Sequence, residues 1–218
     1  MSRYKAAIFD LDGTLLDTLA DLRDSMNHTM ELFGFPTHST EAIRSFVGSG
    51  VEQFVASAVP GGFDNPHFRE IVKEYSEYYG IHSEDQTKPY DGVLDLITKL
   101  KDSGIAVAVV SNKAHSASRG LCRTHFPEVE IVNGEREAEG VRRKPYPDMV
   151  LMTVKEIGVK PEECVYIGDS EVDILTAENA GMDCISVLWG FRDRDYLEEN
   201  GGKVFVENTD ELFSAITD

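Results

Sequence analysis

Apolar runs without polar alternation mark the strands of this chain. Four strong runs lie within residues 6–9, 105–110, 163–168 and 184–189, and weaker ones within 129–132 and 203–206. Such runs are typical of strands covered on both faces, as in a parallel sheet. Between them, apolar residues recur at helical spacing, for example at 93, 96, 97 and 100 before Gly104. This alternation predicts a Rossmann-like, doubly wound α/β fold with a mainly parallel sheet.

Residues 17–82 interrupt that pattern, because they carry almost no strand signal. Asp17 or Thr18 is suited to cap a helix that ends at Gly34. Further helices are predicted after Thr40, over residues 51–58, and from residue 65 onward. We therefore expect a catalytic core made of residues 1–16 and 83–218, with an all-helical cap inserted over residues 17–82.

Composition limits the class of protein. The 218 residues are 41% hydrophobic, which is enough for a packed core, and no apolar run approaches the roughly 18 residues of a membrane span. The first residues lack a signal-peptide pattern. Three cysteines without C-x-x-C spacing are typical of a reducing compartment. These features predict a cytoplasmic protein with no membrane association.

The formal net charge of −18 restricts the partners. So acidic a chain is unsuited to bind nucleic acid or an anionic membrane. It also repels anionic substrates unless local cations reverse the field. The one compact basic cluster is residues 142–144, which could equally be a solvated loop.

Polar side chains follow the strong apolar runs. They are Asp10 and Asp12 after the first run, Ser111, Asn112 and Lys113 after the second, Asp169 and Ser170 after the third, with Asp173 one helical turn further and Lys144 before a proline at the predicted start of a helix. Ligands of open parallel sheets bind at the carboxyl ends of the strands, so these groups should converge there. Each also has a simpler explanation: a turn at Asp12, helix caps at Ser111 and Ser170, a surface lysine at 144. Their joint occurrence at successive strand ends favours a functional site.

The segments "DLDGT", "SNK", a Lys-Pro pair and "GDSEVD" resemble, in this order, the four motifs of the haloacid dehalogenase superfamily. A helical insertion after the first motif is similar to one branch of that superfamily. Within it, "DTLADLRDSMNHTMELFGFP", "VGSG", "SNK" and "RKPYPD" resemble the phosphoglycolate phosphatase group.

This resemblance implies that Asp10 is a nucleophile that forms an aspartyl-phosphate. It also implies Mg²⁺, since two anions need a cation between them. Asp10 and Asp169 would bind the metal through their side chains and Asp12 through its backbone carbonyl. Asp173 and Ser170 would support the metal site.

Asp12 is suited to protonate the leaving oxygen and then to activate water. An acid at this position favours a hydrolase or a mutase. Ser111 and Asn112 would contribute to binding the phosphoryl group, and Lys144 would hold it as a point charge.

In the predicted cap, Gly48 and Gly50 allow close approach of the backbone to a substrate or form a simple turn. Arg44 is suited to a substrate carboxylate or to the surface.

We expect a Mg²⁺-dependent phosphatase of a small phosphorylated metabolite, with 2-phosphoglycolate as the first candidate. A phosphosugar mutase of the β-phosphoglucomutase type, a phosphatase for a nucleotide, sugar phosphate or pyrophosphate, and a non-catalytic binding protein stay open. The sequence is compatible with a monomer and with a homodimer.

Overall fold

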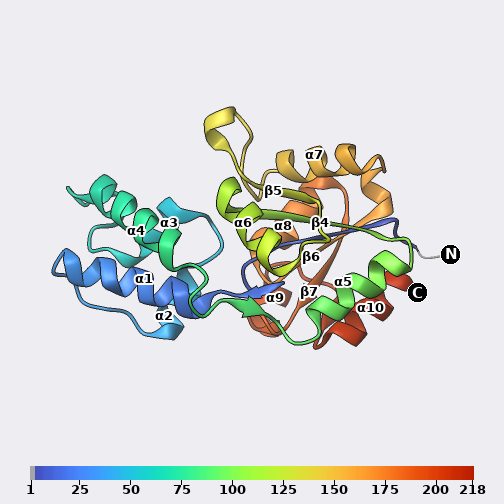
Figure 1. The fold of residues 1–218 in the computed structure, drawn as a ribbon, viewed down its shortest axis with the longest axis horizontal. Coiled ribbons are helices and arrows are strands. Elements are labelled where there is room, and N and C mark those ends of the chain that lie inside the picture. The colour runs from blue at the N-terminus through green and yellow to red at the C-terminus, as the bar shows by residue number, and fades with distance from the viewer. Residues whose placement is uncertain (1–2) are drawn as a thin grey trace. The chain divides into compact units, whose positions relative to one another are not determined.

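The computed structural model describes residues 3–218 (Figure 1). The chain forms two compact units. We call the part up to Leu16 together with Pro89–Asp218 the sheet unit, and Asp17–Lys88 the helical unit. The chain passes between them through the two-stranded sheet of β2 (Leu16–Asp17) and β3 (Lys88–Pro89).

The sheet unit contains a six-stranded sheet in the order β5-β4-β1-β6-β7-β8, and all the neighbouring pairs are parallel. Its strands are β1 (Ala6–Phe9), β4 (Ala106–Ala114), β5 (Ile131–Glu135), β6 (Cys164–Gly168), β7 (Asp183–Val187) and β8 (Phe205–Val206). Each lies at or beside a predicted run. The predicted doubly wound, parallel fold is confirmed.

Alternation along the strands makes both faces of the sheet apolar. On β1, Ala7 and Phe9 belong to one buried cluster and Ala6 and Ile8 to the other. The first cluster is covered by α5 (Val93–Asp102), α6 (His115–His125) and α10 (Thr209–Thr217), and the second by α7 (Asp148–Ile157) and α8 (Glu171–Ala180). Burial on both faces explains why the strands read as continuous apolar runs.

The helical unit has its own core. Its helices are α1 (Leu19–Leu32), α2 (Thr40–Phe46), α3 (Val51–Ala58) and α4 (Phe68–His82). Met26 and Met30 of α1 are fully buried, as are Ile43 of α2 and Ile71 of α4. The helical spacing in the sequence thus corresponds to real packing faces.

The remaining elements are short. They are α9 (Arg194–Glu199) and the 3-10 turns Gly62–Asp64, Glu137–Glu139 and Pro161–Glu163. Within residues 3–218, no helix combines the length and the apolar character needed to cross a membrane.

Three details differ from the sequence-based expectation. The segment 83–88, predicted to belong to the core, groups with the helical unit because the backbone amides of Gln86 and Thr87 donate to the Asp21 carboxylate over 2.8–3.0 Å. Strand β4 continues past Val110 to Ala114, with a register shift between these two residues. Helix α7 begins at Asp148, four residues after Lys144.

Candidate active site

The end of β1 places Asp10 at the centre of the sheet. The backbone amide of Asp10 donates to the Ile167 carbonyl of β6 over 2.8 Å, so the chain is still held by the neighbouring strand at this point. Gly13 then turns the chain with φ of 87°. A Cβ atom on Gly13 would collide with the Asp169 carboxylate. Glycine is therefore needed here for both conformation and close approach.

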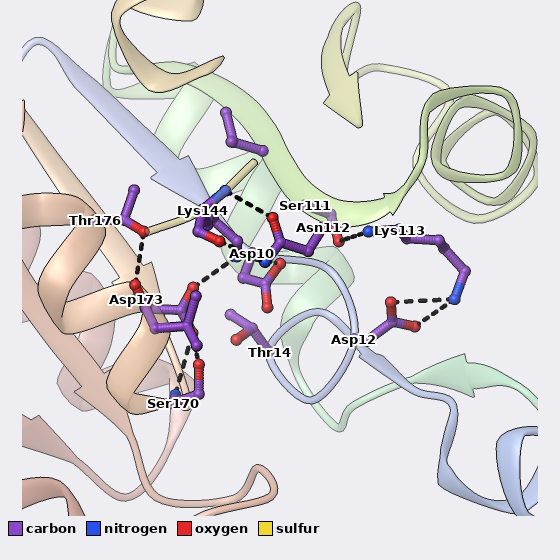
Figure 2. Close-up of polar contacts among 12 residues, drawn as sticks. Asp10, Asp12, Thr14, Ser111, Asn112, Lys113, Lys144, Ser170, Asp173 and Thr176 are labelled. Carbon is purple, nitrogen blue, oxygen red and sulfur yellow. Dashed lines mark hydrogen bonds and ion pairs between the residues drawn. The ribbon is translucent and has the colours of Figure 1, made fainter. Parts of the chain in front are cut away.

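Lys144 lies among the carboxylates and is 3% exposed. Its Nζ atom is 2.8 Å from Asp10 Oδ1 and 2.7 Å from Asp173 Oδ1 (Figure 2). It also donates to the Tyr166 hydroxyl over 3.1 Å. A buried ammonium needs such partners, so this lysine is not a surface residue.

Asn112 fixes the backbone of Lys144. Its amide nitrogen donates to the Lys144 carbonyl over 3.0 Å, and its amide oxygen accepts from the Lys144 amide over 2.8 Å. Tyr166 in turn donates to the Val110 carbonyl over 2.9 Å. These contacts tie the lysine to β4 and β6, which explains how a residue outside the strands reaches the site.

Asp169 is held by two donors. The Thr14 hydroxyl donates to Oδ1 over 3.0 Å and the backbone amide of Phe191 donates to Oδ2 over 2.7 Å. Asp173 accepts from the amide and hydroxyl of Ser170 at 3.1 and 2.6 Å. The predicted residues Asp169, Ser170 and Asp173 are thus brought together with Asp10 and Lys144.

The site has the composition of a cation site. Asp10, Asp169 and Asp173 are buried, and each offers one carboxylate oxygen within 4.8 Å of the others. When these three carboxylates are ionised and Lys144 is protonated, two negative charges remain uncompensated. A hard divalent cation with oxygen ligands balances that surplus. The residues therefore fit a metal such as Mg²⁺, with Asp10 and Asp169 as the predicted side-chain ligands.

Burial controls the protonation of this cluster. In the absence of a cation, burial and the neighbouring Asp173 raise the pKa of Asp10 to about 7, although Lys144 acts to lower it. Burial, Asp173 and Asp10 raise the pKa of Asp169 to about 8. Protons and a metal ion therefore compete for the same oxygens.

This competition predicts a pH-dependent stabilisation by Mg²⁺. Both folded-state pKa values exceed those of unfolded carboxyls, so the metal-free protein should lose stability as pH rises from about 5.5 to about 8.5. Mg²⁺ should offset this loss. We expect the rise in melting temperature between excess chelator and saturating Mg²⁺ to be much larger at the higher pH. An equal rise at both pH values would contradict this description of the cluster.

Asp12 lies apart from the carboxylate cluster. Its two carboxylate oxygens are 2.8 and 3.1 Å from Lys113 Nζ (Figure 2). Its side chain is outside the group of carboxylates that fits a cation. The predicted role of its backbone carbonyl stays a prediction. Ser111 accepts from the Lys113 amide through its hydroxyl oxygen over 3.2 Å, and so shapes the same turn.

The predicted cap residues lie in the helical unit. Arg44 is exposed on α2. Gly48 and Gly50 precede α3 with φ of 130° and 88°, which L-residues rarely adopt. Their backbone conformation explains the glycines without a substrate, and their roles in binding stay predictions.

Three residues of this site, Thr14, Lys113 and Tyr166, have no role predicted from the sequence, although Lys113 was expected among the groups at the strand ends. Thr14 was part of the quoted "DLDGT" motif, and Lys113 of "SNK", so the motifs contained a signal for both. Tyr166 lies in an apolar run, a pattern that predicts only a strand residue. Its hydroxyl contacts residues that are 22 and 56 positions away in sequence, a pairing that no local pattern reveals.

Comparison with known proteins agrees with this geometry. The family model described as haloacid dehalogenase-like hydrolase matches residues 7–187. The chain belongs to this family. The resemblance to the haloacid dehalogenase superfamily seen in the motifs is thereby confirmed.

Relatives of this haloacid dehalogenase-like hydrolase include named phosphatases. A phosphoglycolate phosphatase of Xanthomonas campestris pv. campestris is 32% identical over 195 residues, covering 86% of this chain and 85% of the relative. An N-acetylmuramic acid 6-phosphate phosphatase of Pseudomonas aeruginosa is 29% identical over 216 residues, covering 98% and 95%. A solved structure from Lactobacillus delbrueckii subsp. bulgaricus, named as a candidate phosphoglycolate phosphatase, has a TM-score of 0.93 and 38% identity over 99% of both chains. Family and relatives together support a phosphoric monoester hydrolase.

Proposed function

We propose that this haloacid dehalogenase-like phosphatase is Mg²⁺-dependent and hydrolyses a small phosphate monoester, 2-phosphoglycolate first, through a phosphorylated Asp10. The observation that carries the proposal is the position of Asp10. Its carboxylate lies at the end of the central strand β1 and pairs with the buried Lys144 at 2.8 Å. A carboxylate in that place can attack phosphorus only if cations offset the repulsion between two anions.

The residues divide the chemistry between them. Lys144 neutralises charge on the transferring phosphoryl group, and a bound Mg²⁺ supplies the remaining positive charge at the acidic cluster. Asp10 attacks phosphorus while Asp12 gives a proton to the departing ester oxygen. Asp12 then takes a proton from the water that attacks the phosphorylated Asp10, which releases inorganic phosphate.

The substrate is the finer part of the proposal. The phosphoglycolate phosphatase of X. campestris and the solved structure from L. delbrueckii support 2-phosphoglycolate. The P. aeruginosa relative, named for N-acetylmuramic acid 6-phosphate, supports a sugar phosphate instead. A screen of phosphate monoesters with Mg²⁺, read as release of inorganic phosphate, separates the two. A clear preference for sugar phosphates would reject 2-phosphoglycolate and keep the phosphatase.

The proposed Mg²⁺ requirement leads to a separate prediction. Excess chelator should abolish phosphate release, and added Mg²⁺ should restore it. Ca²⁺ should inhibit, because its larger and looser coordination sphere disturbs in-line geometry. Full activity in excess chelator, with the metal content of the protein measured as zero, would refute the metal requirement.

For the helical unit we propose the role of a cap that selects the substrate. Gly48 and Gly50 are poor sites for a test. Gly50 has a φ of 88°, so a valine in its place would strain the start of α3. Arg44→Met is a better variant, since Arg44 is exposed and its guanidinium suits a carboxylate. It should raise KM for 2-phosphoglycolate about tenfold or more, the value of one charge-assisted contact, and leave KM for acetyl phosphate unchanged.

The matched control is Arg69→Met, which removes an exposed arginine from α4 of the same unit. It should change neither KM. If Arg44→Met also leaves the ratio of the two KM values unchanged, Arg44 does not bind the carboxylate of 2-phosphoglycolate.

A further inference from the structure

We propose that Lys113 is a positioning residue that holds the Asp12 carboxyl for proton transfer. The inference rests on the proposed function, because it assumes that Asp12 is the acid and base of the reaction. It goes further by assigning a role to a residue outside the nucleophile, the cation cluster and the phosphoryl-binding lysine.

The pair of Lys113 and Asp12 is close and largely shielded from water. The Lys113 ammonium lies 2.8 and 3.1 Å from the two Asp12 oxygens, so it contacts both. The side chains are only 7% and 13% exposed. An ion pair on the surface hardly restricts its side chains. A shielded pair with two contacts restricts the rotation of a short carboxylate side chain.

The backbone of Lys113 is itself fixed. Its amide donates to the Ser111 hydroxyl oxygen over 3.2 Å, and its carbonyl accepts from the Ser118 hydroxyl on α6 over 3.2 Å. A Cβ atom on Gly134 of β5 would lie 2.6 Å from that carbonyl, so the neighbouring strand also packs tightly against it. The lysine is therefore anchored by three elements and can act as a fixed support.

The two carboxylates of the "DLD" segment pair with two different lysines. Lys144 pairs with Asp10 at 2.8 Å, and Lys113 pairs with Asp12 on the other side of the site (Figure 2). Asp12 thereby stays out of the cluster of Asp10, Asp169 and Asp173, where a fourth carboxylate would add like charge. Without Lys113, the side chain of Asp12 would gain rotational freedom.

The position of Asp12 matters when the bond between phosphorus and the ester oxygen breaks. As the Asp10 oxygen bonds to phosphorus, the bond from phosphorus to the ester oxygen breaks, and its electron pair stays on that oxygen. The proton of the Asp12 carboxyl neutralises it and yields an alcohol. One Asp12 oxygen can carry this proton while the other accepts from Lys113. An alkoxide needs that proton, whereas p-nitrophenolate is a stable anion and leaves without it.

The test compares two leaving groups. Wild type and Lys113→Met are assayed with p-nitrophenyl phosphate and with an alkyl phosphate that wild type hydrolyses, 2-phosphoglycolate if the proposed substrate holds. We expect kcat/KM to fall about 10- to 100-fold for the alkyl ester, the cost of misplacing a catalytic group, and to stay within about threefold for the aryl ester. Lys113→Arg should recover part of the loss, because it keeps the cation.

Asp12→Asn serves as the reference. It should show the same dependence on leaving group, and adding Lys113→Met to it should have no further effect. Lys99→Met removes an exposed lysine from α5 and should change neither rate. If Asp12→Asn is selective for the alkyl ester and folded Lys113→Met lowers both substrates equally or neither, Lys113 does not position Asp12. If Asp12→Asn itself is not selective, the proposed role of Asp12 fails first, and the positioning role of Lys113 fails with it.

Discussion

Asp10→Asn should abolish phosphate release, with a loss of at least about 10⁴-fold in kcat for every substrate. Asparagine has nearly the shape of aspartate but cannot form the acyl-phosphate. The loss should be independent of the leaving group, because in the proposed mechanism every ester passes through the same attack of Asp10 on phosphorus. The measurement is phosphate release at saturating Mg²⁺ with both alkyl and aryl esters.

The fold should survive this change. Asp10→Asn removes one of three buried carboxylates, so the metal-free variant should melt at or above the wild-type temperature at about pH 8.5, where the Asp10 carboxyl with its pKa of about 7 is ionised. That result separates lost chemistry from lost structure. Activity within about tenfold of wild type in a folded variant would reject Asp10 as the nucleophile.

Lys144→Met should damage both catalysis and stability. Its ammonium contacts Asp10, Asp173 and the Tyr166 hydroxyl within 3.1 Å. Removing one partner of a buried ion pair typically costs about 3–5 kcal/mol. In the proposed mechanism this charge stabilises the transferring phosphoryl group, so its loss should lower kcat by about 10²- to 10³-fold.

The pH dependence of this variant has a definite sign. Lys144 acts to lower the pKa of Asp10, so its removal raises that pKa further. A carboxyl with a raised folded-state pKa makes the folded protein less stable as pH increases. In chelator, the difference in the free energy of unfolding between wild type and Lys144→Met should therefore grow from about pH 5.5 to about pH 8.5. Unfolding measured with urea at both pH values checks this.

A second substitution separates the two effects of Lys144. In Lys144→Met combined with Asp173→Asn, one buried carboxylate is removed with its partner, so much of the stability should return while kcat stays low. Recovery of activity together with stability would show that Lys144 acts only on folding. Wild-type stability of Lys144→Met alone would contradict its role as the counter-ion of the cluster.

Much of the fold was predictable from local patterns. Residues 6–9 and 51–58 match β1 and α3 as the structure has them, because a buried strand and an amphipathic helix each leave a periodic signal. Helix α6 left little signal, since its sequence HSASRGLCRTH is mostly polar and contains glycine. The contact of Asp21 with Gln86 and Thr87 left no signal, because it joins positions more than sixty residues apart.

The candidate active site was also predictable only in part. Strand ends and motif resemblance predicted Asp10, Lys144, Asp169 and Asp173 together, and the structure places them in one cluster. The partners of single side chains were not predictable. Nothing in the spacing shows that the Asp12 carboxylate pairs with Lys113, since such a choice depends on how neighbouring strands orient their side chains.

The most direct test of the account is to trap the enzyme during turnover. Wild type mixed with Mg²⁺ and an excess of substrate is quenched in acid within milliseconds and digested, and the peptides are analysed by mass spectrometry. We expect one added phosphoryl group on the peptide that contains Asp10, and none on the same peptide of Asp10→Asn. A phosphorylated peptide elsewhere, or none at any quench time in an enzyme that releases phosphate with a pre-steady-state burst, would contradict it.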